Sequence, residues 1–385
     1  MRKVAVIAIG YTKVSEHWNL SIRELFTEAA LMALNEASIG QIDALYIGNM
    51  FSGYCQHQEH LGVLMADYIG LKSPPAVKVE AAGASGGMAL REGVQAVASG
   101  LHDFVMVGGV EKMTDVLSTD ITSALAMAAD QEYEAFIGAT FVALNAMVKR
   151  AYQHKYGVSD ELIATLPVHC HEMASKNPYA QLPFKISVEQ VLSSPFIAEP
   201  LRLLECSPVG DGAAVLMLCP LEKAKDFTDT PIEIVGVGAA TDTLALYQRD
   251  DLTTFKATIE AAEMAYKMAH IKPDDVDVAE IHDAFSITGI ISLEDLGFFE
   301  KGKAAEAISE GQIAPGGKVA VNTFGGLKAR GHPIGATGVY QAVEVVKQLR
   351  GDAEKNQVED AKIGLTQNVG GVGGTVTVHI FRRLG

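Results

Sequence analysis

The stretch VEAAGASGGMALREGVQAVASG, residues 79–100, predicts a short strand, a tight turn of glycine, alanine and serine, and then a helix. A turn of this kind places one residue at a helix N-terminus, where backbone N–H groups have no intrahelical partner and attract negative charge. The residue at the tip is Gly83, which has no side chain. The sequence therefore predicts an elbow that usually presents a reactive residue and here presents none.

Much of the chain around this elbow is repeated. A buried strand, a helix leading into a strand, and the elbow helix each recur later in the same order, and both copies of the elbow helix lead into an apolar strand. The pairs are residues 3–14 with 232–243, 28–48 with 260–282, and 84–100 with 335–351. Three matches in one order indicate an internal duplication. Each half then has the order strand–helix–strand–helix–strand, which predicts a mostly parallel sheet covered by helices.

The duplication also predicts the domain organisation. The first half spans residues 1–230 and the second spans 231–385. Residues from about 115 to 200 interrupt the repeat with helical segments and the loop-rich stretch SKNPYAQLPFK. We interpret this interruption as a loop domain inserted into the first half.

Composition limits the functions that this chain can have. The 385 residues are 48% hydrophobic and 20% charged, as in a globular protein with a large core. The net charge of −16 argues against nucleic acid as a partner, and the short apolar runs argue against a membrane span. Four scattered cysteines without a CxxC pair predict neither disulfides nor a metal site, and they favour a cytoplasmic location.

Three further motifs carry candidate chemistry. His282 follows a strand in EIHDAF, His332 precedes a helix in GHPIGATG, and Gly370 ends a strand in NVGG. Strand ends and helix starts gather at one crevice of an α/β fold. A histidine can exchange a proton near neutral pH, and exposed N–H groups can hold an oxyanion. These residues therefore point to acyl chemistry.

VEAAGASGG, EIHDAF, GHPIGATG and NVGG, in this order, resemble the thiolase superfamily, particularly the sterol-carrier-protein type and archaeal biosynthetic thiolases. The resemblance covers essentially the whole chain. It implies the α/β thiolase fold, in which two duplicated halves of mixed five-stranded sheets lie between helices in layers (αβαβα), with an inserted loop domain. It also implies a homodimer or tetramer.

The resemblance assigns a role to each motif. The elbow position, Gly83 here, would hold the nucleophilic cysteine that takes the acyl group from an acyl-CoA. His332 would activate that thiol, and His282 would bind the thioester oxygen of the second acyl-CoA and stabilise its enolate. Gly370 would form the other oxyanion hole, together with the N–H of the elbow residue.

The sequence departs from the family pattern at the positions where thiolases have their catalytic cysteines. Gly83 replaces the nucleophile, and a second cysteine is missing at both of its usual places, Ala284 and Asn368. Two explanations of Gly83 remain open at this point: replacement of a cysteine in a working enzyme, or a natural non-thiolase on the same scaffold. In either case covalent acyl transfer through this position is impossible.

The resemblance implies an acyl-CoA C-acyltransferase, specifically an acetyl-CoA C-acetyltransferase that condenses two acetyl-CoA to acetoacetyl-CoA and feeds the mevalonate pathway, crippled at Gly83. Coenzyme A thioesters would be substrates, with no permanently bound cofactor. The implied partners are 3-hydroxy-3-methylglutaryl-CoA synthase and a small zinc-ribbon/OB-fold protein. The alternative is a non-catalytic acyl-CoA-binding pseudoenzyme or scaffold subunit, so the sequence leaves open whether the chain is an enzyme.

Overall fold

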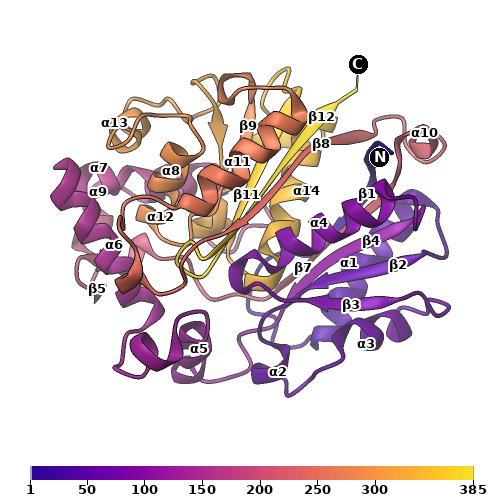
Figure 1. Cartoon of the computed structure of the whole chain (residues 1–385), viewed down its shortest axis with the longest axis horizontal. Helices are drawn as coiled ribbons and strands as arrows, with labels where there is room; N and C mark the ends of the chain where they lie inside the picture. The colour runs from indigo at the N-terminus through magenta and orange to yellow at the C-terminus, as the bar shows by residue number, and fades with distance from the viewer. Residues whose placement is uncertain (1, 385) are drawn as a thin grey trace.

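Ten strands of the chain form one sheet in the computed structural model, which describes residues 2–384 (Figure 1). The strand order is β10-β9-β11-β12-β8-β1-β7-β4-β2-β3. The sheet divides between β8 and β1 into two groups of five strands, one from each half of the chain. The strands of the first group are β1 (Val4–Tyr11), β2 (Ala44–Gly48), β3 (Ala76–Val79), β4 (Val105–Glu111) and β7 (Gly212–Pro220). Those of the second are β8 (Ile232–Thr241), β9 (Val278–Glu280), β10 (Ala320–Val321), β11 (Ile363–Gly370) and β12 (Thr375–Arg383).

The two groups have the same internal pattern. In each, two strand pairings are parallel and two are antiparallel, so that one strand runs opposite to the other four, and β1 and β8 join the groups antiparallel. The expectation of a mostly parallel sheet is therefore wrong for one strand of each half, β7 in the first and β12 in the second. The physical reason is clearest between β11 and β12, because residues 371–374 form a turn too short to return the chain for parallel pairing. The implied mixed five-stranded halves are confirmed.

Equivalent contacts at equivalent places show the duplication directly. Asp43 precedes β2, and its Oδ2 accepts the backbone N–H groups of Asp103 and Phe104 at 2.9 and 2.8 Å. Asp277 precedes β9, and its Oδ2 accepts those of residues 362 and 363 at 2.8 and 2.9 Å. The strand registers match as well, since Ala44 pairs with residue 105 and Val278 with residue 364. The two halves thus have equivalent strand registers at these positions.

Helices cover the sheet in layers. Helices α4 (Ser85–Ala98) and α14 (Thr337–Arg350) pack on each other and on strands from both halves, so they form the central layer (Figure 1). Their apolar faces share one buried cluster with residues of both sheet groups. The outer helices, α1 (Ile22–Ala37) and α11 (Lys256–Ala269), pack on the other side of their own strands. This arrangement brings the N-termini of α4 and α14 into contact at the centre of the molecule.

The second copy of the elbow aligns with the first one residue away from the sequence-based match. Helix α4 begins at Ser85 after the 3-10 turn Ala82–Ala84, and α14 begins at Thr337 after the turn Ile334–Ala336. The equivalent of Gly83 is therefore Gly335. The shift arose because both helices contain small residues at several adjacent positions, so that neighbouring alignments look alike.

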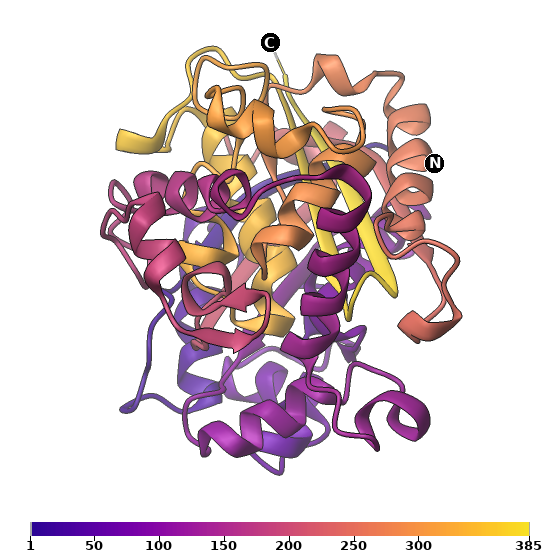
Figure 2. The ribbon, with the colours of Figure 1, turned by 90° about the vertical axis from the view of Figure 1, so that its left-hand side faces the viewer.

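A mostly helical segment connects β4 to β7, and it lies to one side of the sheet (Figure 2). Its elements are α5 (Ser118–Ala126), a π-helical turn (Gln131–Ala135), α6 (Phe141–Tyr156), α7 (Asp160–Ile163), α8 (Thr165–Ala174), α9 (Val188–Ser193), the two-stranded sheet of β5 (Phe196–Ala198) and β6 (Leu201–Arg202), and the 3-10 turn Leu203–Glu205. The equivalent connection in the second half is the short turn after β11. The remaining helices are α2 (Ser52–Cys55), α3 (Leu61–Tyr68), α10 (Leu221–Ala224), α12 (Ser286–Asp295) and α13 (Ala304–Ser309), with short 3-10 turns at Leu246–Gln248, Pro273–Asp275 and Glu354–Asn356 and a π-helical turn at Gly326–Arg330.

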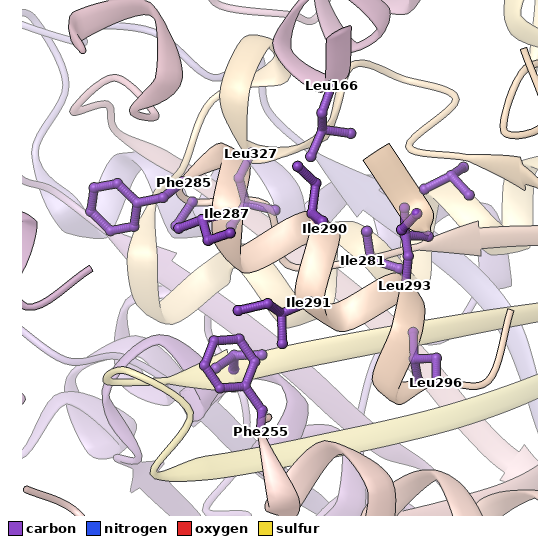
Figure 3. Close-up of a cluster of buried hydrophobic side chains, with 14 of the residues drawn as sticks. Leu166, Phe255, Ile281, Phe285, Ile287, Ile290, Ile291, Leu293, Leu296 and Leu327 are labelled. Atoms are coloured by element: carbon purple, nitrogen blue, oxygen red, sulfur yellow. The ribbon is translucent and has the colours of Figure 1, made fainter. Parts of the chain in front are cut away.

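A large apolar cluster fixes the segment that carries His282. Helix α12 is buried along its whole length, and Figure 3 shows Ile287, Ile290 and Ile291 pointing from it into this cluster. Ile281 and Phe285, on either side of the histidine, belong to the same cluster. The motif EIHDAF is thus anchored at both ends by buried side chains. No helix between residues 2 and 384 is both long and apolar enough to cross a membrane.

Candidate active site

The elbow is a 3-10 turn, Ala82–Ala84, that runs directly into α4. Ala82 has a left-handed backbone with φ of 50°, which few residues other than glycine adopt. The Ser85 hydroxyl holds the turn, because it accepts the N–H of Ala81 at 2.9 Å and donates to the carbonyl of Ala82 at 2.6 Å. Gly83 is buried and held in a fixed orientation at the start of the helix.

A side chain at position 83 would stand between His282 and β11. An ideal Cβ on Gly83 would lie 3.2 Å from Cε1 and 3.6 Å from Nε2 of His282. The same Cβ would lie only 2.4 Å from the Val369 carbonyl oxygen, which is closer than van der Waals contact allows. The volume where a thiol would attach therefore faces a histidine but is partly filled by a backbone carbonyl.

The hydrogen bonds of His282 determine which of its ring nitrogens carries the proton. Its Nδ1 lies 3.3 Å from the backbone N of Val369 and 3.3 Å from Nδ2 of Asn368. A backbone N–H can only donate, so Nδ1 is the acceptor and Nε2 carries the proton. Burial, with a contribution from Arg330, lowers the pKa of His282 to about 3. His282 therefore presents a neutral N–H donor toward the elbow.

His332 has the opposite polarity. Its Nδ1 lies 2.7 Å from the hydroxyl of Thr337, which itself donates to the carbonyl of Pro333 at 3.1 Å. A hydroxyl has one proton, so Thr337 accepts from Nδ1–H of His332, and Nε2 keeps a lone pair. Burial, followed by His282 and Arg330, lowers the pKa of His332 well below its usual value. His332 is thus a neutral base.

The two histidines meet edge to face. Their ring centroids lie 5.1 Å apart and the rings are perpendicular, at 89°. Among the described residues neither Nε2 has a hydrogen-bond partner, whereas both Nδ1 atoms are bonded. The structure therefore brings Gly83, His282 and His332 together as one donor and one base beside an elbow without a side chain.

Gly370 lies next to the elbow but does not direct its amide to it. A Cβ on Gly370 would lie 2.3 Å from the Ala81 carbonyl oxygen, so strand and turn are in close contact. In a trans peptide the C=O and N–H point in opposite directions. Because the Val369 carbonyl faces Gly83, the N–H of Gly370 faces away from it. The expected pairing of the Gly83 and Gly370 amides is not formed in this structure.

A buried ion pair supplies positive potential beside both histidines. Arg330 is only 2% exposed, its Nε lies 2.9 Å from Oε1 of Glu344, and its guanidinium lies 4.7 Å from the centre of the Tyr340 ring. The Nε–H is not aligned for a hydrogen bond, and Nη1 and Nη2 have no acceptor among residues 2–384. The positive charge of Arg330 disfavours protonation of His282 and His332 and so lowers the pKa of both.

Three parts of the site were not predicted from the sequence: Thr337, Val369 and Arg330. Thr337 follows His332 by five residues at the first position of a helix, so the GHPIGATG motif contained a signal for it. Arg330, two residues before His332, is equally local. Nothing in the sequence around Val369 indicates the orientation of its carbonyl.

None of the four cysteines replaces the missing thiol. Burial raises the pKa of Cys55, Cys206 and Cys219 to about 12 and that of Cys170 well above its usual value, so none is a thiolate near neutral pH. Cys170 instead donates to Asp283 at 3.2 Å. Within residues 2–384 no three histidine, cysteine, aspartate or glutamate side chains are grouped to hold a metal ion.

Known proteins resemble this chain over its whole length. The description "Thiolase, N-terminal domain" matches residues 4–222, and "Thiolase C-terminal domain-like" matches residues 238–383. The chain is 52% identical to the acetyl-CoA acetyltransferase of Methanothermobacter thermautotrophicus, with 100% of both chains covered. It is 50% identical to that of Methanocaldococcus jannaschii, with 99% of both covered.

A solved structure described as "Ltp2-ChsH2(DUF35) aldolase" is similar with a TM-score of 0.84 and 26% identity, over 98% of this chain and 97% of that one. Human mitochondrial 3-ketoacyl-CoA thiolase shares the fold, with a TM-score of 0.77 and 18% identity over 100% of this chain and 99% of that one. The two family descriptions together cover almost the entire sequence, and the fold and the relatives agree with them. The chain belongs to the thiolase family.

Proposed function

We propose that this chain binds acyl-CoA at the Gly83 elbow, as an acyl-CoA C-acyltransferase of the thiolase family whose covalent route is blocked. The parent reaction is the condensation of two acetyl-CoA to acetoacetyl-CoA and free coenzyme A. Two relatives that are about half identical over essentially their full lengths are named acetyl-CoA acetyltransferase. The observation that carries the proposal is the pair of histidines of opposite polarity that meet beside Gly83.

The geometry gives each residue a role in this proposal. His332, with its free lone pair, would remove a proton from a cysteine thiol at position 83, if one were present. It can also remove a proton from the α-carbon of a bound acyl group. His282 donates its Nε2–H to the thioester oxygen, where the enolate charge develops. The Gly370 amide would join the Gly83 amide in a second oxyanion hole only after the peptide between Val369 and Gly370 has turned over. Coenzyme A thioesters are substrates here, and no resident cofactor is needed.

Loss of the nucleophile has a large expected effect. Removing one member of an established catalytic group can lower turnover by about a millionfold. The chain is therefore proposed to be a crippled acetyl-CoA C-acetyltransferase, related to enzymes that supply the mevalonate pathway. The alternative is a non-catalytic acyl-CoA-binding pseudoenzyme or scaffold subunit, which would bind acyl-CoA without any turnover.

We further propose partners and an assembly. A homodimer or tetramer in the cytoplasm, associated with 3-hydroxy-3-methylglutaryl-CoA synthase and a zinc-ribbon/OB-fold protein, fits the family resemblance. In support, the similar aldolase structure carries DUF35 in its description, "Ltp2-ChsH2(DUF35) aldolase".

The decisive experiment restores the thiol. Acetoacetyl-CoA thiolysis is measured for the unchanged chain, Gly83→Cys and Gly83→Ser, where serine adds a similar volume without a thiolate. We expect activity only in Gly83→Cys. If Gly83→Cys folds, binds acetyl-CoA and still shows no thiolysis, the acyltransferase proposal is wrong and the scaffold alternative stands.

A further inference from the structure

We propose that the unchanged protein makes and breaks a carbon–carbon bond without a covalent intermediate, by reversible aldol cleavage of β-hydroxyacyl thioesters. The inference rests on the proposed binding of acyl-CoA at the elbow, but it concerns a different reaction. Its substrate is a β-hydroxyacyl-CoA, and its products are an acyl-CoA and an aldehyde or ketone.

The first reason is that the elbow is packed as a glycine site. The Val369 carbonyl oxygen lies 2.4 Å from the ideal Cβ position of residue 83, and a backbone atom cannot move aside as cheaply as the end of a side chain. The same peptide turns the N–H of Gly370 away from the elbow. The oxyanion hole that an acyl-enzyme would need is therefore absent together with its nucleophile.

The second reason is that the groups needed for enolate chemistry remain, in the correct protonation states. The Nε2–H of His282 is a donor without a partner, on a side chain only 3% exposed, and it faces the elbow. The Nε2 of His332 is a free base, because Thr337 takes the Nδ1 proton. One donor and one base are sufficient to form an enolate, whereas acyl transfer also needs a nucleophile.

The proposed step balances without any further reagent. Nε2 of His332 takes the proton of the β-hydroxyl group, and the hydroxyl oxygen becomes the carbonyl oxygen of the leaving aldehyde or ketone. The electrons of the Cα–Cβ bond move to the thioester, whose oxygen becomes an enolate held by Nε2–H of His282. The protonated His332 then returns the proton to Cα, giving the acyl-CoA. The reverse sequence joins the two products.

The experiment uses the full-length protein and two substrates, 3-hydroxybutyryl-CoA and 3-hydroxy-3-methylbutyryl-CoA, which give acetaldehyde and acetone. The carbonyl product and acetyl-CoA are measured together. We expect them in equal amounts from at least one substrate, and we expect a loss of at least about 100-fold in His332→Asn. His154→Asn serves as the matched control, because His154 is exposed on α6, and it should keep full activity.

A second pair of variants tests the base if His332→Asn does not fold. Thr337→Val removes the acceptor of the Nδ1 proton, so we expect about a tenfold loss, and Thr337→Ser should restore the rate. Calorimetric binding of acetyl-CoA and exchange of its methyl protons in D2O are measured in parallel. Binding without cleavage of either substrate overturns the aldol inference and leaves the proposed acyl-CoA site intact. Failure to bind acetyl-CoA overturns both.

Discussion

Replacing Gly83 by alanine adds one methyl group at the point where the elbow meets β11. The new Cβ would lie 2.4 Å from the Val369 carbonyl oxygen, whereas ordinary contact begins at 3.4 Å. The strand or the turn must therefore shift by about 1 Å, and overpacking of this size costs about 1–3 kcal/mol. Loss of the conformational freedom of glycine in the unfolded chain offsets about 0.5–1 kcal/mol of this. We expect a net destabilisation of about 1 kcal/mol, within a range of about 0–2.5 kcal/mol.

The assay is urea unfolding at one fixed protein concentration, with Gly40→Ala as the matched control. Gly40 is exposed, and no atom lies within 4 Å of its ideal Cβ position. Gly40→Ala should therefore be neutral or stabilising by up to about 1 kcal/mol. If Gly83→Ala is as stable as Gly40→Ala, the Val369 carbonyl does not fill the elbow, and the argument for a glycine-adapted site is wrong.

Three further predictions concern charge, thiols and symmetry. Arg330→Met combined with Glu344→Gln removes the positive potential without leaving a lone buried charge, so the pKa of His332 rises. The rate of exchange of the acetyl-CoA methyl protons falls at low pH, where His332 becomes protonated. In the double variant this fall should occur at higher pH, because the neutral base is lost earlier as the pH decreases. An unchanged pH profile would show that Arg330 does not act on His332. At pH 8 all four cysteines of the native chain should react slowly with iodoacetamide, because burial raises the pKa of their thiols. The same cysteines should react rapidly in urea. A cysteine that reacts rapidly in the native chain would contradict this. Each of the variants Asp43→Ala and Asp277→Ala should lower the free energy of unfolding by about 1–3 kcal/mol, because each carboxylate accepts two backbone N–H groups. The two losses, measured by urea unfolding, should be similar, because the two residues occupy equivalent places. Clearly unequal losses would argue against this equivalence.

The fold was largely predictable from local patterns. The elbow is a strand end, a run of small residues and an amphipathic helix, and each part has its own signal within about twenty residues. Repetition of that signal predicted the duplication, whereas the two five-stranded groups were implied by the resemblance to the thiolase superfamily. The antiparallel placement of β7 and β12 was missed by the repeat argument, because the direction of a strand depends on the path of its connection rather than on the pattern within the strand.

The residues of the site were predictable from the sequence, but which of their groups donate hydrogen bonds and which accept them was not. The tautomer of His282 depends on the N–H of Val369, a residue 87 positions away. The direction of the Gly370 amide depends on how β11 packs against the elbow. Both are consequences of tertiary contacts, so a motif can name the residues and still leave open whether each one donates or accepts.

The duplication also explains why each chain should have one site rather than two. In the second elbow the N–H of Gly335, the equivalent of Gly83, donates at 2.8 Å to the buried carboxylate of Glu111. The strand registers make Glu111 the counterpart of Gly370, and Gly48 the counterpart of His282.

Each elbow is thus covered by the other half of the chain. The Gly335 elbow is closed by the carboxylate of Glu111. At the corresponding places, the Gly83 elbow has His282 and Gly370, which has no side chain. An elbow amide that already donates to an internal carboxyl oxygen is not available to a ligand, so only the Gly83 elbow can accept one. Titration with acetyl-CoA should therefore saturate at one equivalent per chain, and a second equivalent of similar affinity would contradict this assignment of the two elbows.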